Sequence, residues 1–408
     1  MYSKELLNLI SSEITLLKDQ KKYKNESVLE SPQGAKVLVN GKKVLMFASN
    51  NYLGLANHPD IIQFAKEAMD LYGYGMSSVR FISGTTKIHI ALEKKLSEFL
   101  QTEDTMLFNS CFAANEAFFA SLIHQTEGQD KKSVIYSDEL NHASIIDGLK
   151  LIKKDLVVKR IYPHSDLSVL EKMIQEDKNK NYFIKIIVSD GVFSMEGELA
   201  KLPGLVKLAK DYDALLFVDD SHGVGVCGLN GKGSPEELGI LGQIDILSGT
   251  LGKAFGGASG GYLSGKKELI EFLRQKSRPY IFSNSLPPMI AGASIKAIDL
   301  LNNNPELLKQ SKENTIYFRE QIKIRGFKII EGNHPIVPIH IGRADLAQKM
   351  QKELLEKGLY VVGLWFPVVA EGQARLRVQI SSVHTKEDID KAIDILTIIG
   401  KKLEVIKD

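Results

Sequence analysis

Three short apolar runs, at residues 185–189, 215–218 and 244–247, constrain the fold of this chain more than any other feature. Stretches with helical periodicity, such as residues 202–212, separate them. Strands that read as continuous apolar runs and alternate with helices are typical of a parallel sheet covered by helices on both faces. The pattern from about residue 60 to residue 290 therefore predicts an α/β domain with a mainly parallel sheet.

The last third of the chain follows a different pattern. We expect one long helix over residues 289–325, strands at 328–330, 337–341, 360–364 and 374–380, and helices at 345–357 and from residue 386. This mixture predicts a smaller α+β domain. The N-terminal helix and residues 36–47 are expected to join it. The predicted boundaries are 1–58 for that N-terminal part, 59–290 for the large domain and 291–408 for the small domain.

Polar residues follow the apolar runs at their carboxyl ends, as Asp190, Asp219 and Thr250. In an open parallel sheet, ligands bind beyond the carboxyl ends of the strands. Lys253 lies at that same end, in a loop of glycine and small residues from 249 to 258. Burying a lysine among such residues costs free energy, so its amine is expected to have a function there. Desolvation lowers the pKa of the amine, and the neutral amine can then form a Schiff base.

Lys253 and Asp219 together indicate a specific cofactor. Pyridoxal phosphate needs a lysine for its aldehyde and an acid for its ring nitrogen. Asp219 is the better partner for that nitrogen, and His222 follows on the same loop. Asp220 is expected to serve packing or hydrogen bonding.

Two further motifs have an ordinary structural explanation beside a functional one. Cys111 and Phe112 open a predicted helix after a short strand, and free amides at a helix start suit a phosphate. A plain N-cap at Asn109 or Ser110 explains the same residues. His142 lies at a strand-to-helix turn, where it could be structural or stack on a cofactor ring.

The composition limits the class of protein. The formal net charge of +2 gives no sign of a nucleic-acid binder, and no apolar run approaches the roughly 20 residues that span a membrane. The two cysteines, Cys111 and Cys227, suggest no disulfide framework, which fits a cytoplasmic protein. Residues 228–234 and 256–261 lack the spacing of nucleotide-binding loops. No His, Cys and carboxylate cluster has metal-ligand spacing, so no metal is expected.

Taken together, these residues resemble the α-oxoamine synthases, a branch of the fold-type I pyridoxal-phosphate enzymes. The resemblance covers nearly the whole chain and is closest to the glycine C-acetyltransferase group. Six stretches carry it, at residues 48–59, 74–85, 140–148, 190–195, 278–285 and 372–378.

The resemblance implies a role for each of the matching residues. Lys253 would bind the cofactor aldehyde and later move the α-proton of the substrate. Asp219 would pair with the ring nitrogen, His222 would lie at the O3′ side and His142 would stack on the ring. The other implied contacts are Cys111, Phe112 and Thr250 on the phosphate, Ser194 in the cofactor site, Ser283 and Asn284 from a partner subunit, Asn50 and Arg377 on the substrate, and Val79 near the acyl chain.

The implied activity is the condensation of glycine with acetyl-CoA to 2-amino-3-oxobutanoate and CoA, in a homodimer with a shared active site. Within the family, 8-amino-7-oxononanoate synthase and 5-aminolevulinate synthase are the alternatives. In aminolevulinate synthases, polar residues stand at the positions of Val79 and Phe81, and the apolar pair here favours a short acyl group. A pyridoxal-phosphate-sensing regulator is a more remote alternative, because it needs a DNA-binding domain and the first 60 residues have no helix-turn-helix pattern.

Overall fold

The computed structural model describes residues 2–20, 22–24 and 26–407. Its helices are α1 Lys4–Asp19, α2 Pro59–Tyr72, α3 Arg80–Ser83, α4 Lys87–Leu100, α5 Cys111–His124, α6 Ala143–Lys150, α7 Leu167–Glu176, α8 Leu202–Asp211, α9 Ser234–Glu237, α10 Lys267–Lys276, α11 Arg278–Ile281, α12 Pro288–Asn303, α13 Glu306–Ile324, α14 Ala344–Glu356 and α15 Lys386–Lys402, with a 3-10 turn at Leu55–Asn57. Its strands are β1 Lys36–Val39, β2 Lys42–Met46, β3 Asp104–Phe108, β4 Ser133–Asp138, β5 Val157–Tyr162, β6 Lys185–Asp190, β7 Val192–Phe193, β8 Glu198–Leu199, β9 Leu215–Asp219, β10 Ile246–Thr250, β11 Gly261–Gly265, β12 Ile336–Gly342, β13 Leu359–Tyr360, β14 Val362–Leu364 and β15 Ala374–Gln379.

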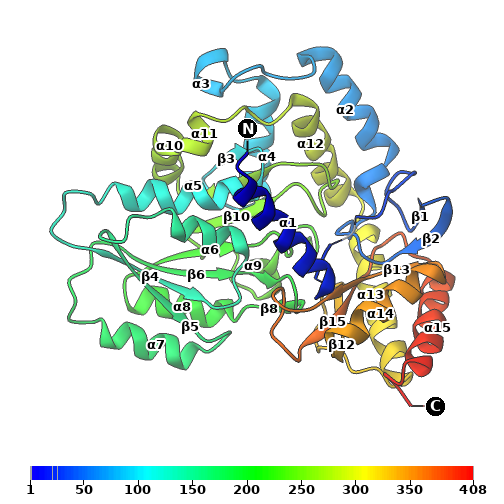
Figure 1. Cartoon of the computed structure of the whole chain (residues 1–408). Helices are drawn as coiled ribbons and strands as arrows, with labels where there is room; N and C mark the ends of the chain where they lie inside the picture. Colours follow the sequence, from blue (N-terminus) through cyan, green and yellow to red (C-terminus); the bar gives the residue numbers. More distant parts are fainter. Residues whose placement is uncertain (1, 21, 25, 408) are drawn as a thin grey trace.

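A seven-stranded sheet forms the centre of the large part of the molecule (Figure 1), in the order β3-β11-β10-β9-β6-β4-β5. The neighbouring pairs from β10 to β5 are parallel, and only β11 runs against its neighbours. The predicted mainly parallel α/β sheet is confirmed. Asp190, Asp219 and Thr250 are the last residues of β6, β9 and β10, so their side chains meet at one edge of the sheet.

Helices cover both faces of this sheet, which explains why its interior strands are largely apolar. In β9, Leu216 and Val218 belong to the core beneath α4, α7, α8 and α12, whereas Phe217 belongs to the core beneath α5, α6 and α10. Successive side chains of a strand point to opposite faces. Each interior strand therefore supplies apolar side chains to two cores.

The smaller part of the molecule has its own core around the antiparallel sheet β12-β15-β14. Helices α13, α14 and α15 contribute to that core, as do Leu45 and Phe47. Strand β2 pairs with β13 in parallel, which ties residues 36–47 to the C-terminal third of the chain. Helix α12 runs through the predicted boundary at residue 290, and its buried face belongs to the large core. The boundaries themselves stay a prediction.

Three local expectations were wrong, and two strands were missed. The expected helix over 289–325 is two helices, because Pro305 follows Asn304 and the residue before a proline avoids the helical conformation. The strand expected at 328–330 is only an isolated bridge between Ile329 and Ile339. The strand expected at 244–247 begins two residues later, at Ile246. Strands β5 and β11 were not predicted, since β5 alternates in burial at the sheet edge and β11 has glycine at both ends.

None of the helices in the described ranges is long and apolar enough to cross a membrane. Within the same residues, no group of His, Cys, Asp and Glu side chains could hold a metal ion.

Candidate active site

A cavity of about 220 Å³ lies at the carboxyl edge of the main sheet. Seven residues predicted for the site line it, namely Cys111, Phe112, His142, Asp219, His222, Thr250 and Lys253. These residues come from four separate loops, spread over more than 140 positions of the sequence. The parallel sheet brings them together, because the carboxyl ends of its strands share one edge.

Lys253 and Asp219 face the same cavity from adjacent strands. Strands β9 and β10 pair in parallel with Asp219 opposite Ser248, and Lys253 follows the end of β10. Burial lowers the pKa of the Lys253 amine, and the negative charge of Asp219 partly opposes that shift. A lower pKa makes the neutral, nucleophilic amine more accessible.

Buried donors hold the carboxylate of Asp219 in place. Asn115 Nδ2 donates to Asp219 Oδ2 at 2.6 Å, and the backbone N–H of Ser221 donates to Oδ1 at 3.0 Å. Asn115 also donates to Ser144 Oγ at 2.8 Å. Nothing in the sequence selects Asn115, because a single asparagine within an apolar helix has no distinctive pattern. Its position on the buried face of α5 is the one signal that could have found it.

His142 is fixed at the start of α6 by contacts on both sides. Its Nδ1 lies 2.8 Å from Ser144 Oγ, and its backbone N–H donates to Asp190 Oδ1 at 3.3 Å. Burial lowers the pKa of His142, so its ring is uncharged near neutral pH. Burial, and then the nearby Asp219, raise the pKa of the Asp190 carboxyl well above its ordinary value. A flat, neutral and immobile ring is suited to stack on a planar ligand.

The start of α5 forms one corner of the cavity, and free backbone amides at a helix start suit an anion. Ser110 caps the helix by accepting a hydrogen bond from the Ala113 N–H at 3.1 Å, so the predicted cap and the predicted helix start are both present. A side chain on Gly261 would lie 2.2 Å from Cys111 N, so only glycine permits this close approach of β11. Thr250 lines the same cavity, and its hydroxyl donates to Gly260 O at 3.1 Å.

Arg377, on β15, is a partly buried cation with unused donors. Its Nε and Nη2 atoms are buried without hydrogen-bond partners in the described part of the chain. Its positive charge contributes to lowering the pKa of both His222 and Lys253, which places it near the cavity. An unpaired buried guanidinium is costly and presents a fork that matches a carboxylate. This orphaned fork, with Lys253 and Asp219, fits an amino acid held on pyridoxal phosphate.

The remaining predicted site residues do not line this cavity in the single chain. Ser194 lies in the turn between β7 and β8, and Asn50 accepts a hydrogen bond from Gln379. Ser283 Oγ accepts from Asn109 Nδ2 at 2.9 Å, while Asn284 follows it in the loop after α11. Val79 is buried at the start of α3. Their predicted contacts remain predictions.

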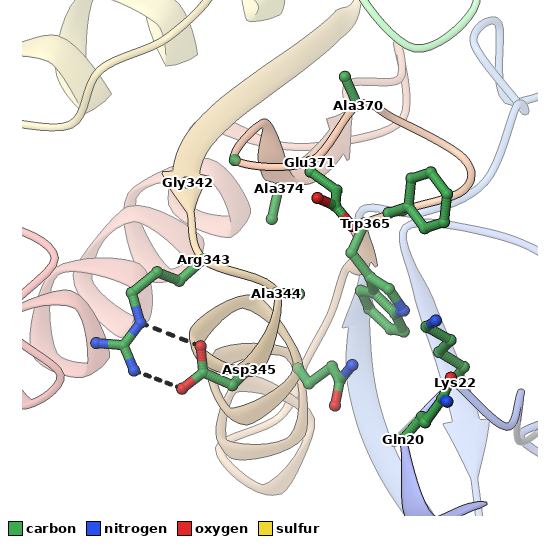
Figure 2. A pocket seen from close by; sticks show the side chains of 13 residues that line it. Gln20, Lys22, Gly342, Arg343, Ala344, Asp345, Trp365, Ala370, Glu371 and Ala374 are labelled. Atoms are coloured by element: carbon green, nitrogen blue, oxygen red, sulfur yellow. Dashed lines mark hydrogen bonds and ion pairs between the residues drawn. The ribbon is translucent and has the colours of Figure 1, made fainter. Parts of the chain in front are cut away.

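A larger cavity, of about 500 Å³, lies apart from this chemistry (Figure 2). Trp365 and Glu371 stand on one side of it, and Arg343 is paired with Asp345 at 2.6 Å on the other. It contains neither a buried lysine nor an unpaired buried carboxylate among its lining residues. The smaller cavity is therefore the candidate active site.

Comparison with known proteins agrees with this geometry. The family described as aminotransferase class I and II matches residues 42–396 of the chain. The chain belongs to this family. It is 48% identical over 386 residues to the 2-amino-3-ketobutyrate coenzyme A ligase of Salmonella typhimurium, with 94% of each protein covered. It is 44% identical to the 8-amino-7-oxononanoate synthase of Thermoanaerobacter pseudethanolicus, with 98% of each covered.

Solved structures show the same fold. A high-resolution structure of SPT with a PLP internal aldimine superimposes with a TM-score of 0.90 and 28% identity, and 100% of both chains is covered. The expected fold-type I architecture is thus confirmed.

Proposed function

We propose that this chain is a pyridoxal-phosphate-dependent acyltransferase that condenses glycine with acetyl-CoA to give 2-amino-3-oxobutanoate and CoA. The observation that carries the proposal is one cavity lined by Lys253 and Asp219, with the unpaired Arg377 beside it. The 48% identity to a 2-amino-3-ketobutyrate coenzyme A ligase over 94% of both chains supports the choice of substrates.

The cofactor, when bound, supplies an aldehyde for the amino group of glycine and a ring that accepts negative charge from the α-carbon. Lys253 would hold that aldehyde through its amine, and as a free amine it would be the base that takes the α-proton of glycine. Asp219, held by Asn115, would keep the ring nitrogen protonated. His142 would lie against one face of the ring, and the first amides of α5 would hold the phosphate together with Thr250.

Arg377 orients the substrate in this scheme. Its free Nε and Nη2 donors would bind the glycine carboxylate as a fork. The contacts of Asn50 with the substrate and of Ser194 with the cofactor rest on the family resemblance alone. The new carbon–carbon bond joins the glycine α-carbon to the acetyl carbonyl carbon, and the thiol of CoA leaves. The reverse reaction, cleavage of 2-amino-3-oxobutanoate with CoA, would complete threonine breakdown.

A homodimer with a shared active site completes the proposal. The helix α1 has no buried residue, and Leu6, Leu9 and Ile10 on it are exposed apolar side chains. Phe282, next to Ser283, is 68% exposed. Large exposed apolar side chains that gather on an element suggest a protein interface. Ser283 and Asn284 would then reach the phosphate of the partner subunit.

The acyl donor separates this activity from its alternative. The 44% identity to an 8-amino-7-oxononanoate synthase makes a longer acyl thioester the alternative substrate. Val79 is buried, whereas Phe81 is 67% exposed and lies outside the cavity, so Phe81 can limit the acyl chain only across a dimer interface. We favour acetyl-CoA because a succinyl carboxylate would find no polar partner at these two positions.

A CoA-release assay tests the function directly. With glycine, kcat/KM for acetyl-CoA should exceed that for succinyl-CoA by about 100-fold, which corresponds to roughly 2.7 kcal/mol. Propionyl- and pimeloyl-CoA complete the series. Comparable values for pimeloyl-CoA would establish the alternative, and a lack of CoA release with every pair would contradict the proposal. A cytoplasmic location is also proposed, since Cys111 and Cys227 are buried free thiols, and cell fractionation tests it.

A further inference from the structure

The ring of His222 is held from behind by residues far away in the sequence. Its Nδ1 lies 2.9 Å from the hydroxyl of Tyr52, and both side chains are buried. The ring of His334 packs edge-on nearby, and its Nε2 lies 2.9 Å from the carbonyl oxygen of His222. Of the two ring nitrogens of His222, Nδ1 has a hydrogen-bond partner among the described residues. Nε2 is the nitrogen that can meet a ligand in the cavity, which His222 lines.

The protonation states of this pair are set by burial. Burial raises the pKa of the Tyr52 phenol to about 12, so the hydroxyl keeps its proton at neutral pH. Burial lowers the pKa of His222 well below its ordinary value, and the charges of Lys253 and Arg377 lower it further. The imidazole is therefore neutral, with one nitrogen as a donor and the other as an acceptor.

The direction of the hydrogen bonds follows from Gln379. Its amide nitrogen can only donate, and it donates to the Tyr52 hydroxyl at 3.2 Å and also to Asn50 Oδ1. The Tyr52 hydroxyl has two acceptors within reach, Asn50 Oδ1 at 3.2 Å, which also accepts from Gln379, and Nδ1 of His222 at 2.9 Å. We assign the single proton of Tyr52 to Nδ1 of His222, because that contact is the shorter of the two. A ring that accepts at Nδ1 carries its own proton on Nε2.

We propose that Tyr52, oriented by Gln379, is a positioning residue that fixes the Nε2–H tautomer of His222 and so presents an N–H donor to the cavity. This donor stabilises an anionic oxygen on the ligand beside Lys253. What the donor acts on rests on the proposed function, but the tautomer itself can be measured without any ligand.

Nitrogen-15 NMR of the histidine rings in the ligand-free full-length chain tests the tautomer, with His222 assigned by a His222→Gln variant. The wild-type protein should show His222 protonated at Nε2. Tyr52→Phe should give a mixture of both tautomers. Gln379→Glu supplies an acceptor for the Tyr52 proton and should shift His222 to the Nδ1–H form. Tyr262→Phe is the matched control, because Tyr262 is equally buried and its hydroxyl has no partner among the described residues.

A second readout uses the loaded protein. Partial loss of the donor in Tyr52→Phe should raise the pKa of the visible cofactor absorbance by up to about one unit, the scale of one charged hydrogen bond, and Tyr262→Phe should leave it unchanged. A wild-type His222 protonated at Nδ1, or an unchanged single tautomer in Tyr52→Phe, would overturn the inference. If Tyr52→Phe does not fold, the wild-type and Gln379→Glu spectra decide. Failure of the chain to take up pyridoxal phosphate would instead contradict the proposed function and leave the tautomer test intact.

Discussion

Asn115 and Asp219 lie 104 positions apart in the sequence and are joined by a hydrogen bond of 2.6 Å. The amide of Asn115 also donates to Ser144, so α5 holds both the carboxylate expected to meet the cofactor ring and the loop that carries His142. Helix α5 also begins at the proposed phosphate corner. One helix therefore fixes the two ends of the proposed cofactor site relative to each other.

Asn115→Ala should weaken cofactor binding. It removes a hydrogen bond to a buried carboxylate, which is worth about 1.5–3 kcal/mol, or roughly tenfold to a hundredfold in affinity. Titration of the cofactor-free protein with pyridoxal phosphate measures this change. Asn314→Ala is the matched control, since Asn314 is also buried and donates twice, to Ser381 O and His384 O, far from the cavity. Equal loss of affinity in both variants would mean that Asn115 acts only through stability.

Lys253→Ala should abolish the yellow absorbance of the cofactor-bound protein and its turnover, because the variant has no amine to bind the aldehyde. Lys185→Ala is a suitable control. Lys185 is the first residue of β6, at the end of the strand away from the cavity, and its Nζ donates to Tyr212 O. Absorbance spectra and a CoA-release assay give the result. A borohydride-reducible lysine adduct at full occupancy in Lys253→Ala would show that another lysine binds the cofactor.

Arg377→Lys should weaken glycine binding by roughly 1–3 kcal/mol and leave cofactor affinity intact, because lysine cannot reproduce the two parallel donors of a guanidinium. Arg375→Lys makes a good comparison, since Arg375 is already occupied by Met195 O and Glu196. Spectral titration of the loaded protein with glycine measures the affinity. Unchanged affinity in Arg377→Lys together with a loss in Arg375→Lys would transfer the role to Arg375.

His384 should make the protein labile to acid. Burial lowers its pKa to about 4, and in the neutral ring Nε2 lies 2.9 Å from Met46 O while Nδ1 accepts from the Ser381 N–H. The unfolded chain binds this proton near pH 6.5, so the stabilisation is present above pH 6.5 and is lost as pH falls toward 4.

The slope contributed by His384 is about 1.4 kcal/mol per pH unit in that window. The free energy of unfolding of His384→Gln should therefore depend less steeply on pH between 6 and 4.5 than that of the wild type. Denaturant unfolding at several pH values measures the difference, and His340→Gln, at an exposed position of β12, serves as the control. Parallel pH profiles for the wild type and His384→Gln would contradict this prediction.

Hybrid dimers test the shared active site. Mixing an inactive Lys253→Ala subunit with an Asn284→Ala subunit should restore some activity, because one site of the hybrid then has Lys253 and an intact Asn284 from its partner. Mixing Lys253→Ala with Arg377→Ala is the control. This mixture would regain activity only if one active site took its Lys253 and its Arg377 from different subunits. Both residues are assigned to the same subunit, so no recovery is expected. An active, cofactor-loaded monomer in sedimentation would contradict the shared site.

The sequence determined the sheet and the strand-end chemistry of this protein. Apolar runs that need burial on both faces predict a parallel sheet wherever helices separate them, and Asp190, Asp219 and Thr250 lie at the carboxyl ends of those runs. Lys253 could be selected because a lysine among glycine and apolar residues is locally anomalous. The helix start predicted at Cys111 also depends on a local signal, the N-cap residue Ser110 before it.

Which distant residues support that chemistry depends on the tertiary fold. Tyr52 and His222 are 170 positions apart, and Asn115 on α5 is 104 positions from Asp219, so neither contact leaves a periodic or local pattern. Arg377 became distinctive through its buried and unpaired donors, which a sequence does not display. Burial and hydrogen-bond direction depend on what surrounds a side chain in space, and those surroundings are set by the packing of the two cores against the sheets.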